Sequence, residues 1–257
     1  IMDLSGKNIV ITGAASGIGR AMARRFHTEG AGRLYLTDVN EAGLTAVAKE
    51  VGAEHLAVDV GSEEAVTALI ASAEASLGPI DLLCNNAGIS VPGGPEVETE
   101  DWQKIWQINV MAHVWATRAA LPAMLARGDG YLLHTASAAG LLTQIGSAPY
   151  AVTKHAAVAY AEWLAITYGD RGIKVSALCP QAVRTAMTAG HEDGVASVDG
   201  MMDPEVLCEA VVETLRSEAF LVLPHPEVLT YLQRKAGDYD RWLKGMRRLQ
   251  LAYGDAP

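Results

Sequence analysis

The sequence predicts an α/β protein built on a doubly wound, seven-stranded parallel sheet flanked by helices. Short apolar runs rich in β-branched residues alternate with longer segments of helical periodicity, which is the pattern of strand–helix–strand units. A glycine-rich turn joins the first apolar run to the first helical segment. Because no repeat or linker interrupts the alternation, and a length of 257 residues suits one α/β domain, we expect residues 1–257 to form a single domain.

The strands are expected at the apolar runs, which occupy residues 7–12, 33–38, 54–58, 80–85, 130–135, 173–179 and 219–223. The helices are expected between them, at residues 17–29, 41–51, 62–77, 99–127, 148–168 and 203–217. Two segments depart from the alternation. Residues 186–202 are rich in glycine and methionine, which suits a lid over a substrate, although a solvated surface loop can have the same composition.

The second departure is a C-terminal extension over residues 224–257. It contains an apolar stripe of helical spacing, formed by Trp242, Leu243, Met246 and Leu249, beside the basic residues Arg241, Lys244, Arg247 and Arg248. Basic amphipathic helices can bind membrane surfaces. The acidic character of the whole chain instead favours packing against its own core or a neighbouring subunit, where the extension could wall a substrate pocket.

The composition limits the classes of partner. Twenty basic and thirty acidic residues give a net charge of −10, which opposes binding to nucleic acid and to an anionic membrane. No stretch approaches the roughly 18 apolar residues of a membrane-spanning helix, and the N-terminal residues do not resemble an export signal, so we expect a cytoplasmic protein. Three widely separated cysteines argue against a zinc ribbon or a disulfide framework. The contiguous residues His191, Glu192 and Asp193 cannot easily converge on one ion, so we expect no metal.

The first apolar run leads into a turn that contains Gly13, Gly17 and Gly19. A turn without Cβ atoms can bend tightly and approach a pyrophosphate, and the free N–H groups of the helix that follows attract the anion. The spacing G-x-x-x-G-x-G differs from the G-x-G-x-x-G dinucleotide fingerprint. Close packing of a helix on a strand would also favour glycine here, so these residues alone leave both interpretations open.

Asp38 supports the dinucleotide interpretation. It ends the second apolar run, about 20 residues after the glycines, where a carboxylate can accept hydrogen bonds from the adenosine ribose hydroxyls and repel a 2′-phosphate. Neither Ser16 nor Val39 and Asn40 supply a positive charge for such a phosphate. The expected cofactor is therefore NAD rather than NADP.

Tyr150 and Lys154 are four residues apart in a predicted helix, so they project from the same face. A nearby ammonium group, together with the positive nicotinamide ring, is expected to lower the pKa of the phenol from about 10 toward the neutral range, so that Tyr150 can take the proton of an alcohol. Ser137 follows the fifth apolar run, where its hydroxyl can hold the substrate oxygen. A Tyr–Lys pair alone is more often a surface contact.

The order of these motifs resembles the short-chain dehydrogenase/reductase family, from about residue 5 to residue 185. The resemblance rests on the glycine turn, Asp59-Val60, Asn85-Asn86-Ala87-Gly88 and the four residues Asn109, Ser137, Tyr150 and Lys154. It implies a Rossmann-like fold and a catalytic role for those four, with Asn109 at a helix kink that binds a water of the proton relay. It also implies that the dinucleotide is bound by Gly13, Ser16, Gly17, Ile18, Gly19, Asp38, Asp59, Val60, Asn86, Tyr150, Lys154, Val183 and Thr185.

One departure from the family pattern concerns the substrate. Where the family has Pro-Gly, this chain reads Pro180-Gln181, which adds a polar side chain to the expected floor of the active site. The expected substrate is a hydrophobic secondary alcohol or ketone of aromatic, alicyclic or steroid-like character, because Leu141, Leu142, Ile145, Met187, Met201 and Met202 could form an apolar pocket, although they could equally be core residues.

Two other functions remain open. A ketoreductase of 3-oxoacyl type is disfavoured by Asp38 and by the altered C-terminus, and a catalytically silent dinucleotide-binding sensor is disfavoured by the complete set of catalytic residues. The resemblance further implies a homotetramer or homodimer built on the long helices near residues 99–127 and 148–168.

Overall fold

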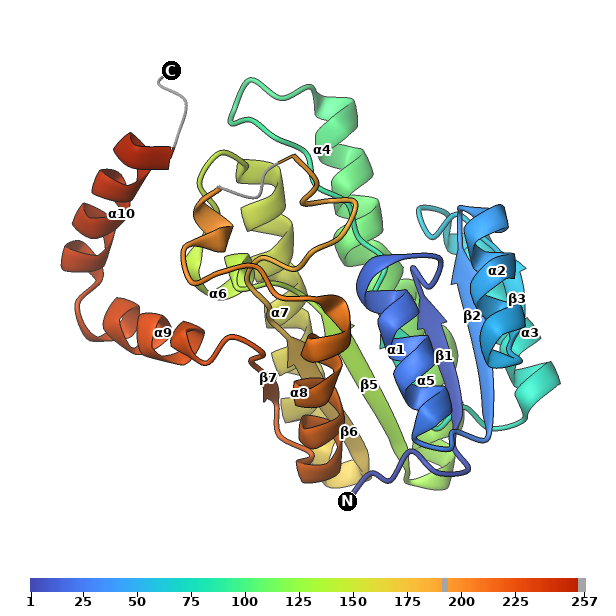
Figure 1. The fold of residues 1–257 in the computed structure, drawn as a ribbon. Coiled ribbons are helices and arrows are strands. Elements are labelled where there is room, and N and C mark those ends of the chain that lie inside the picture. The colour runs from blue at the N-terminus through green and yellow to red at the C-terminus, as the bar shows by residue number, and fades with distance from the viewer. Residues whose placement is uncertain (191–193, 254–257) are drawn as a thin grey trace.

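The fold is a single twisted sheet with helices on both faces (Figure 1). A computed structural model describes residues 1–190 and 194–253. Within these ranges seven parallel strands lie in the order β3-β2-β1-β4-β5-β6-β7. They are β1 (Asn8–Thr12), β2 (Arg33–Asp38), β3 (Glu54–Ala57), β4 (Leu82–Asn85), β5 (Gly130–Thr135), β6 (Ile173–Leu178) and β7 (Leu221–Val222). The predicted fold is therefore confirmed, with shorter first, third, fourth, sixth and seventh strands than the apolar runs indicated.

Two hydrophobic clusters hold the helices against the sheet, because alternate residues of each strand face opposite sides. One cluster packs Ile9 and Ile11 against α1 (Gly17–Thr28), α2 (Glu41–Val51) and α8 (Pro204–Ser217). The other packs Val10 against α3 (Glu63–Leu77), α5 (Ala112–Arg127) and α7 (Ala148–Tyr168). No helix of the described residues is both long and apolar enough to cross a membrane.

The strand order reverses between β1 and β4. The connection after β1 leads toward β2, and the connection after β4 leads toward β5, so the two loops diverge at the carboxyl end of the sheet. In open parallel sheets this divergence creates the crevice in which ligands bind. The glycine turn follows β1 and the Asn86 loop follows β4, so both predicted motifs lie at this point.

The helix expected at residues 99–127 is interrupted. The structure has α4 (Thr99–Trp106), a π-helical turn (Gln107–Met111) and then α5. Asn109 lies in the π-helical turn, whose wider hydrogen-bonding pattern adds a residue to the local turn. Periodicity did not predict this interruption, because the flanking turns retain helical spacing.

The C-terminal extension forms two helices that lead away from the sheet beyond β7 (Figure 1). These are α9 (Glu227–Gly237) and α10 (Tyr239–Tyr253), separated at Asp238, whose carboxylate accepts a hydrogen bond from the backbone N–H of Arg241 at 2.9 Å. The chain reaches its own core mainly through α9, where Val228 is fully buried. No residue of α10 is buried, although Trp242 packs against the edge of the core.

Candidate active site

A cavity of about 380 Å³ opens at the carboxyl end of the sheet. Most of the site residues expected from the sequence line it: Gly13, Ser16, Gly17, Ile18, Asp38, Asp59, Val60, Asn86, Ser137, Tyr150, Lys154, Val183 and Thr185. Two of the expected residues, Gly19 and Asn109, are buried behind the cavity wall and do not line it. The cavity thus runs from Asp38 at one end to Ser137 and Tyr150 at the other.

The glycine turn requires glycine for steric reasons that differ between positions. Gly13 and Gly17 have φ values of +66° and +53°, which side chains with a Cβ rarely adopt. A Cβ on Gly19 would lie 2.1 Å from the carbonyl oxygen of Gly13, so this glycine lets α1 approach the turn. The turn therefore presents backbone rather than side chains to the cavity, which suits the close approach of a phosphate.

Thr12 and Asn86 join the glycine turn to the neighbouring strands. The Thr12 hydroxyl accepts hydrogen bonds from the backbone N–H groups of Asn86 (2.9 Å) and Ala87 (3.0 Å). In return, the Asn86 amide donates to the carbonyl oxygens of Thr12 (3.1 Å) and Gly13 (3.3 Å), and its own oxygen accepts from the Thr135 hydroxyl (3.0 Å). The loops that follow β1, β4 and β5 are thereby held in one arrangement.

Asp38 lies at the end of the cavity away from Ser137 and Tyr150. Its carboxylate is held by hydrogen bonds from backbone N–H groups. Its two oxygens accept hydrogen bonds from the N–H groups of Ala15 (3.0 Å) and Asn40 (2.9 Å). Each carboxylate oxygen can accept a further hydrogen bond, so the group can still bind hydroxyls. Among the described residues that line the cavity, Lys154 is the only cationic side chain.

Lys154 is buried beside Tyr150, one turn along α7. Its ammonium nitrogen lies 5.5 Å from the centre of the Tyr150 ring and donates a hydrogen bond to the carbonyl oxygen of Thr135 at 3.2 Å. Burial lowers the pKa of Lys154 to about 8, because the charged form loses its hydration. Gly88 and Gly140 leave room for this residue, since a Cβ on Gly88 would approach Nζ at 3.3 Å and a Cβ on Gly140 would approach the Lys154 carbonyl oxygen at 2.5 Å.

The pKa of Tyr150 was expected to fall beside both an ammonium group and a bound nicotinamide ring. In the protein alone, burial raises the pKa of the phenol, and a hydrogen bond from Ser137 only partly opposes this effect. Ser137 itself is buried, and its hydroxyl accepts from the N–H group of Ala139 (3.1 Å) and lies 3.5 Å from the carbonyl oxygen of Pro180. In the protein alone, burial is therefore the dominant influence on the pKa of this phenol.

Asn109 connects α7 to the loop that follows β4. Its amide oxygen accepts from the N–H group of Ile89, and its amide nitrogen donates to the Ile89 carbonyl oxygen, both at 2.9 Å. The nitrogen also donates to the Thr153 hydroxyl at 3.1 Å. Because protein groups use both amide donors, the geometry indicates that Asn109 positions the loop at Ile89 and Thr153, the residue that precedes Lys154. Thr153 was not among the residues expected from the sequence, and the hydrogen bond from Asn109 is what reveals it.

Comparison with known proteins agrees with this geometry. The family model for short chain dehydrogenases matches residues 7–195. This chain is a member of the short-chain dehydrogenase family.

Two relatives and one solved structure resemble this dehydrogenase over 77% to 93% of its length. The 1-deoxy-11-beta-hydroxypentalenate dehydrogenase of Streptomyces exfoliatus is 37% identical over 247 residues, which cover 92% of this chain and 90% of the relative. The 2,5-dichloro-2,5-cyclohexadiene-1,4-diol dehydrogenase of Sphingobium indicum is 39% identical over 202 residues, or 77% of this chain and 80% of the relative. A crystal structure of a short-chain dehydrogenase/reductase from Burkholderia phymatum in complex with NAD superposes with a TM-score of 0.84 at 28% identity, covering 93% of this chain and 96% of that one.

The floor of the cavity in this dehydrogenase is formed by the segment after β6. Val183 is buried and pairs with Met202 in a short parallel bridge, and the N–H group of Thr185 donates to the Thr188 hydroxyl at 3.1 Å. The Gln181 amide donates to a carboxylate oxygen of Asp199 at 3.1 Å, and the backbone N–H of Gln181 donates to Nδ1 of His225 at 3.1 Å. The predicted departure at Gln181 is therefore tied to both the lid segment and the start of the C-terminal extension.

The segment for which a lid was expected, residues 186–202, is described except for 191–193. Ala182 and Met202 exchange backbone contacts across its base, with the N–H of Met202 donating to the Ala182 carbonyl oxygen at 3.1 Å. The possible metal ligands His191, Glu192 and Asp193 lie outside the described residues. Within residues 1–190 and 194–253, no group of three or more His, Cys, Asp or Glu side chains could hold a metal ion.

Of the six apolar residues expected around the substrate, one lines the cavity and three pack in the core, while Ile145 and Met201 are half-buried and belong to neither. Met187 lines the cavity. Leu141 and Leu142 are buried in the cluster with α7, and Met202 packs against the opposite cluster, so these three serve the core. The apolar lining comes instead from Ile89, Ile108 and Ala186, which sequence periodicity did not reveal because two of them lie in loops and one lies in the π-helical turn.

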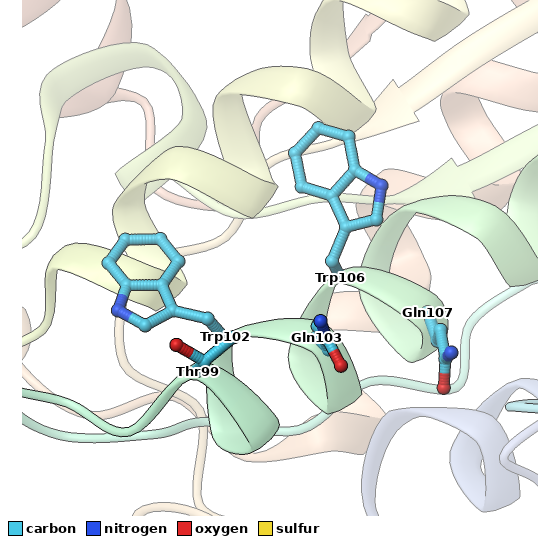
Figure 2. Close-up of a pocket in the computed structure, with 5 residues that line it drawn as sticks. All are labelled: Thr99, Trp102, Gln103, Trp106 and Gln107. Carbon is cyan, nitrogen blue, oxygen red and sulfur yellow. The ribbon is translucent and has the colours of Figure 1, made fainter.

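A second hollow lies on α4, outside the cavity. Figure 2 shows Trp102 and Trp106 projecting from this helix beside the polar side chains of Thr99, Gln103 and Gln107. Its volume is about 350 Å³, and its lining contains no acidic or basic side chain. General acid or base chemistry therefore has no group to use there, and we assign the reaction to the cavity at the end of the sheet.

Proposed function

We propose that this chain is an NAD-dependent dehydrogenase that oxidises an apolar, alicyclic secondary alcohol to the ketone. One observation carries the proposal. A single cavity is lined at one end by the glycine turn and Asp38 and at the other by Ser137, Tyr150 and Lys154. A dinucleotide bound along it would bring its nicotinamide ring toward the residues that can handle a proton.

The residues of the cavity fit NAD. The glycine turn offers a cradle that a Cβ would fill, and Asp38 offers carboxylate oxygens to the ribose hydroxyls. No cationic side chain among the described lining residues accompanies Asp38 to bind a 2′-phosphate. We infer that Ser16, Ile18, Asp59, Val60, Asn86, Val183 and Thr185 complete the cofactor site.

We assign the proton transfer to Tyr150 and the holding of the alcohol oxygen to Ser137. NAD⁺ held by these residues would supply the acceptor for the hydride of the carbinol carbon, and its positive ring would favour the phenolate form of Tyr150. The alcohol proton then passes to the Tyr150 oxygen as the carbonyl forms. Lys154, with a pKa of about 8, retains its ammonium charge at neutral pH and would both support the phenolate and bind the nicotinamide ribose. Burial raises the pKa of Tyr150 in the protein alone, so we infer that bound cofactor assists the formation of this base.

The substrate class follows from the lining and from the relatives. Ile89, Ile108, Ala186 and Met187 give the cavity apolar lining. Two relatives are named as dehydrogenases of alicyclic alcohols, one of a hydroxypentalenate and one of a cyclohexadiene diol. An apolar ring that bears a secondary hydroxyl fits both observations.

We further propose a cytoplasmic homo-oligomer that pairs through α7. Val152, Trp163 and Ile166 are exposed along one face of this helix, with Ile166 at 84% of its full exposure. Trp106 of α4 is also 41% exposed. Exposed apolar residues gathered on a helix face are typical of subunit interfaces. The mass of the full chain in solution, measured by light scattering, tests this part: a monomer would contradict it.

The enzymatic proposal is tested by following the absorbance of reduced nicotinamide while secondary alcohols are offered with NAD⁺ or NADP⁺. Tyr150→Phe should lose at least about 100-fold in kcat, the contribution expected of a general base. Tyr168→Phe is the matched control, because Tyr168 lies at the far end of the same helix. Turnover of Tyr150→Phe at the rate of the unaltered protein would refute the mechanism.

Asp38→Ala tests the cofactor assignment separately. It should reduce the preference for NAD⁺ over NADP⁺ by raising the KM for NAD⁺ and lowering that for NADP⁺. Asp101→Ala, which removes an exposed carboxylate on α4, should change neither value. Unchanged discrimination in Asp38→Ala would remove Asp38 from the ribose site.

A further inference from the structure

The side chain of Gln181 has one end bound and one end free. Its amide nitrogen donates to Oδ2 of Asp199 at 3.1 Å, but its amide oxygen is buried and has no hydrogen-bond partner among the described residues. Gln181 also lines the cavity. Among the described residues that do so, no other side chain presents a buried oxygen or nitrogen without a partner.

The contact with Asp199 fixes which end of the amide is free. A carboxylate can only accept hydrogen bonds, so the nitrogen of Gln181 must face it. The other oxygen of Asp199 accepts from the hydroxyl of Tyr231, on α9, at 2.9 Å, and this holds the carboxylate in place. Turning the Gln181 amide over would set two oxygens against each other. The free group is therefore an acceptor, and it requires a donor.

The residue that carries this acceptor lies close in the chain to the backbone beside Ser137, at the reacting end of the cavity. Gln181 directly follows Pro180, whose carbonyl oxygen lies 3.5 Å from the Ser137 hydroxyl. The backbone of Gln181 is held as well, since its N–H group donates to Nδ1 of the buried His225. Neither the main chain nor the side chain of this residue can move away without breaking a hydrogen bond.

We propose that the amide oxygen of Gln181 accepts a hydrogen bond from a second hydroxyl group of the substrate, which makes the substrate a cyclic diol rather than a simple alcohol. A buried acceptor without a partner disfavours every ligand that leaves it unpaired, and a hydroxyl near the reacting carbon would satisfy it. Ser137 and Tyr150 bind the oxygen that is oxidised, and Gln181 binds the oxygen that is retained. This inference rests on the proposed oxidation of a secondary alcohol.

The test compares cyclohexane-1,2-diol with cyclohexanol as substrates of the full chain. The unaltered protein should favour the diol in kcat/KM by about 10- to 100-fold, as one hydrogen bond to a buried acceptor allows. Gln181→Met preserves the length of the side chain but removes the acceptor, so the ratio of the two kcat/KM values should fall to near one. Gln103→Met, the same substitution at an exposed position of α4 outside the cavity, is the matched control and should retain the preference.

Three results would overturn the inference. The unaltered protein could show no preference for the diol. Gln181→Met could lower kcat/KM equally for both alcohols, which would indicate a structural role in the floor. The variant could also raise the KM for NAD⁺ with either alcohol, which would assign the acceptor to the cofactor.

Absence of turnover with every alcohol would contradict the proposed function instead. The inference about Gln181 would then be decided by calorimetric binding of the diol in the presence of NAD⁺. Binding to the unaltered protein that is weakened at least about tenfold in Gln181→Met would support it, and equal binding to both would refute it.

Discussion

Acidification should destabilise this protein through two buried histidines. His113 on α5 and His134 on β5 are buried, and their Nδ1 atoms lie 3.1 Å apart, so one ring donates to the other. Burial lowers the pKa of His134 from 6.5 to about 3, and burial, His134 and Lys154 together hold the pKa of His113 well below 6.5. Both rings are therefore neutral in the folded protein at a pH where free histidine is charged.

The sign of the effect follows from proton binding. Below pH 6.5 the unfolded chain binds protons that the folded chain excludes, so the free energy of unfolding falls as the pH falls, down to about pH 3 for His134. At pH 5.5, one unit below the ordinary pKa, each neutral ring lowers that free energy by about 1.4 kcal/mol. The pair should then destabilise the fold by about 3 kcal/mol relative to pH 7.5.

Urea unfolding at pH 7.5 and pH 5.5, followed by circular dichroism, measures this difference. Replacing both rings with leucine, as His113→Leu with His134→Leu, should remove most of the pH dependence, because neither position can then bind a proton. His55→Gln, at an exposed position on β3, should leave the dependence unchanged. If the double variant loses as much stability on acidification as the unaltered protein does, the histidine pair is not its cause.

Three further changes test the packing described above. Gly19→Ala would place a Cβ 2.1 Å from the Gly13 carbonyl oxygen, so calorimetry should show NAD⁺ binding weakened at least about tenfold. Gly237→Ala, where a Cβ meets open space, should bind NAD⁺ normally. Equal affinities of the two variants would contradict the role given to the turn. Thr143 has a φ of 81° and a ψ of 163°, a backbone conformation that glycine adopts more easily than threonine. Thr143→Gly should therefore stabilise the protein by about 1 kcal/mol in thermal unfolding. A lower Tm would show that this backbone is not strained. Val228→Ala, at a fully buried position of α9, should lower the free energy of unfolding in urea by about 2 kcal/mol. Leu243→Ala on α10 should change it by no more than about 0.5 kcal/mol. A larger loss at Leu243 would mean that a partner subunit covers α10.

The sheet and most of the cavity lining were predictable because they depend on local sequence and on strand order. Alternating apolar runs predict parallel strands, and residues at the ends of such strands meet at one edge. The glycine turn, Asp38, Ser137 and Tyr150 were assigned to one site on that basis, and they do line one cavity. Their roles in catalysis and cofactor binding stay a proposal.

The sequence was less informative where the structure depends on long-range contacts. The pKa of Tyr150 depends on how deeply the ring is buried, which the spacing to Lys154 does not report. The π-helical turn at Asn109 is stabilised by Ile89 and Thr153, which lie 20 and 44 residues away in the sequence. Leu141 and Leu142 could not be assigned to core or pocket, because both environments select apolar side chains.

The π-helical turn also determines how α4 is oriented about its own axis. An α-helix advances by 100° per residue, so a deletion of one residue within Gln107–Met111 that restored regular helix would rotate α4 by about 100° relative to α5. Ile105, which is now fully buried, would rotate away from the core. The tryptophans shown in Figure 2 would face a different neighbour. A single-residue deletion at this place would therefore alter the outer surface of the protein and the setting of Asn109 together, so the length of this segment constrains both.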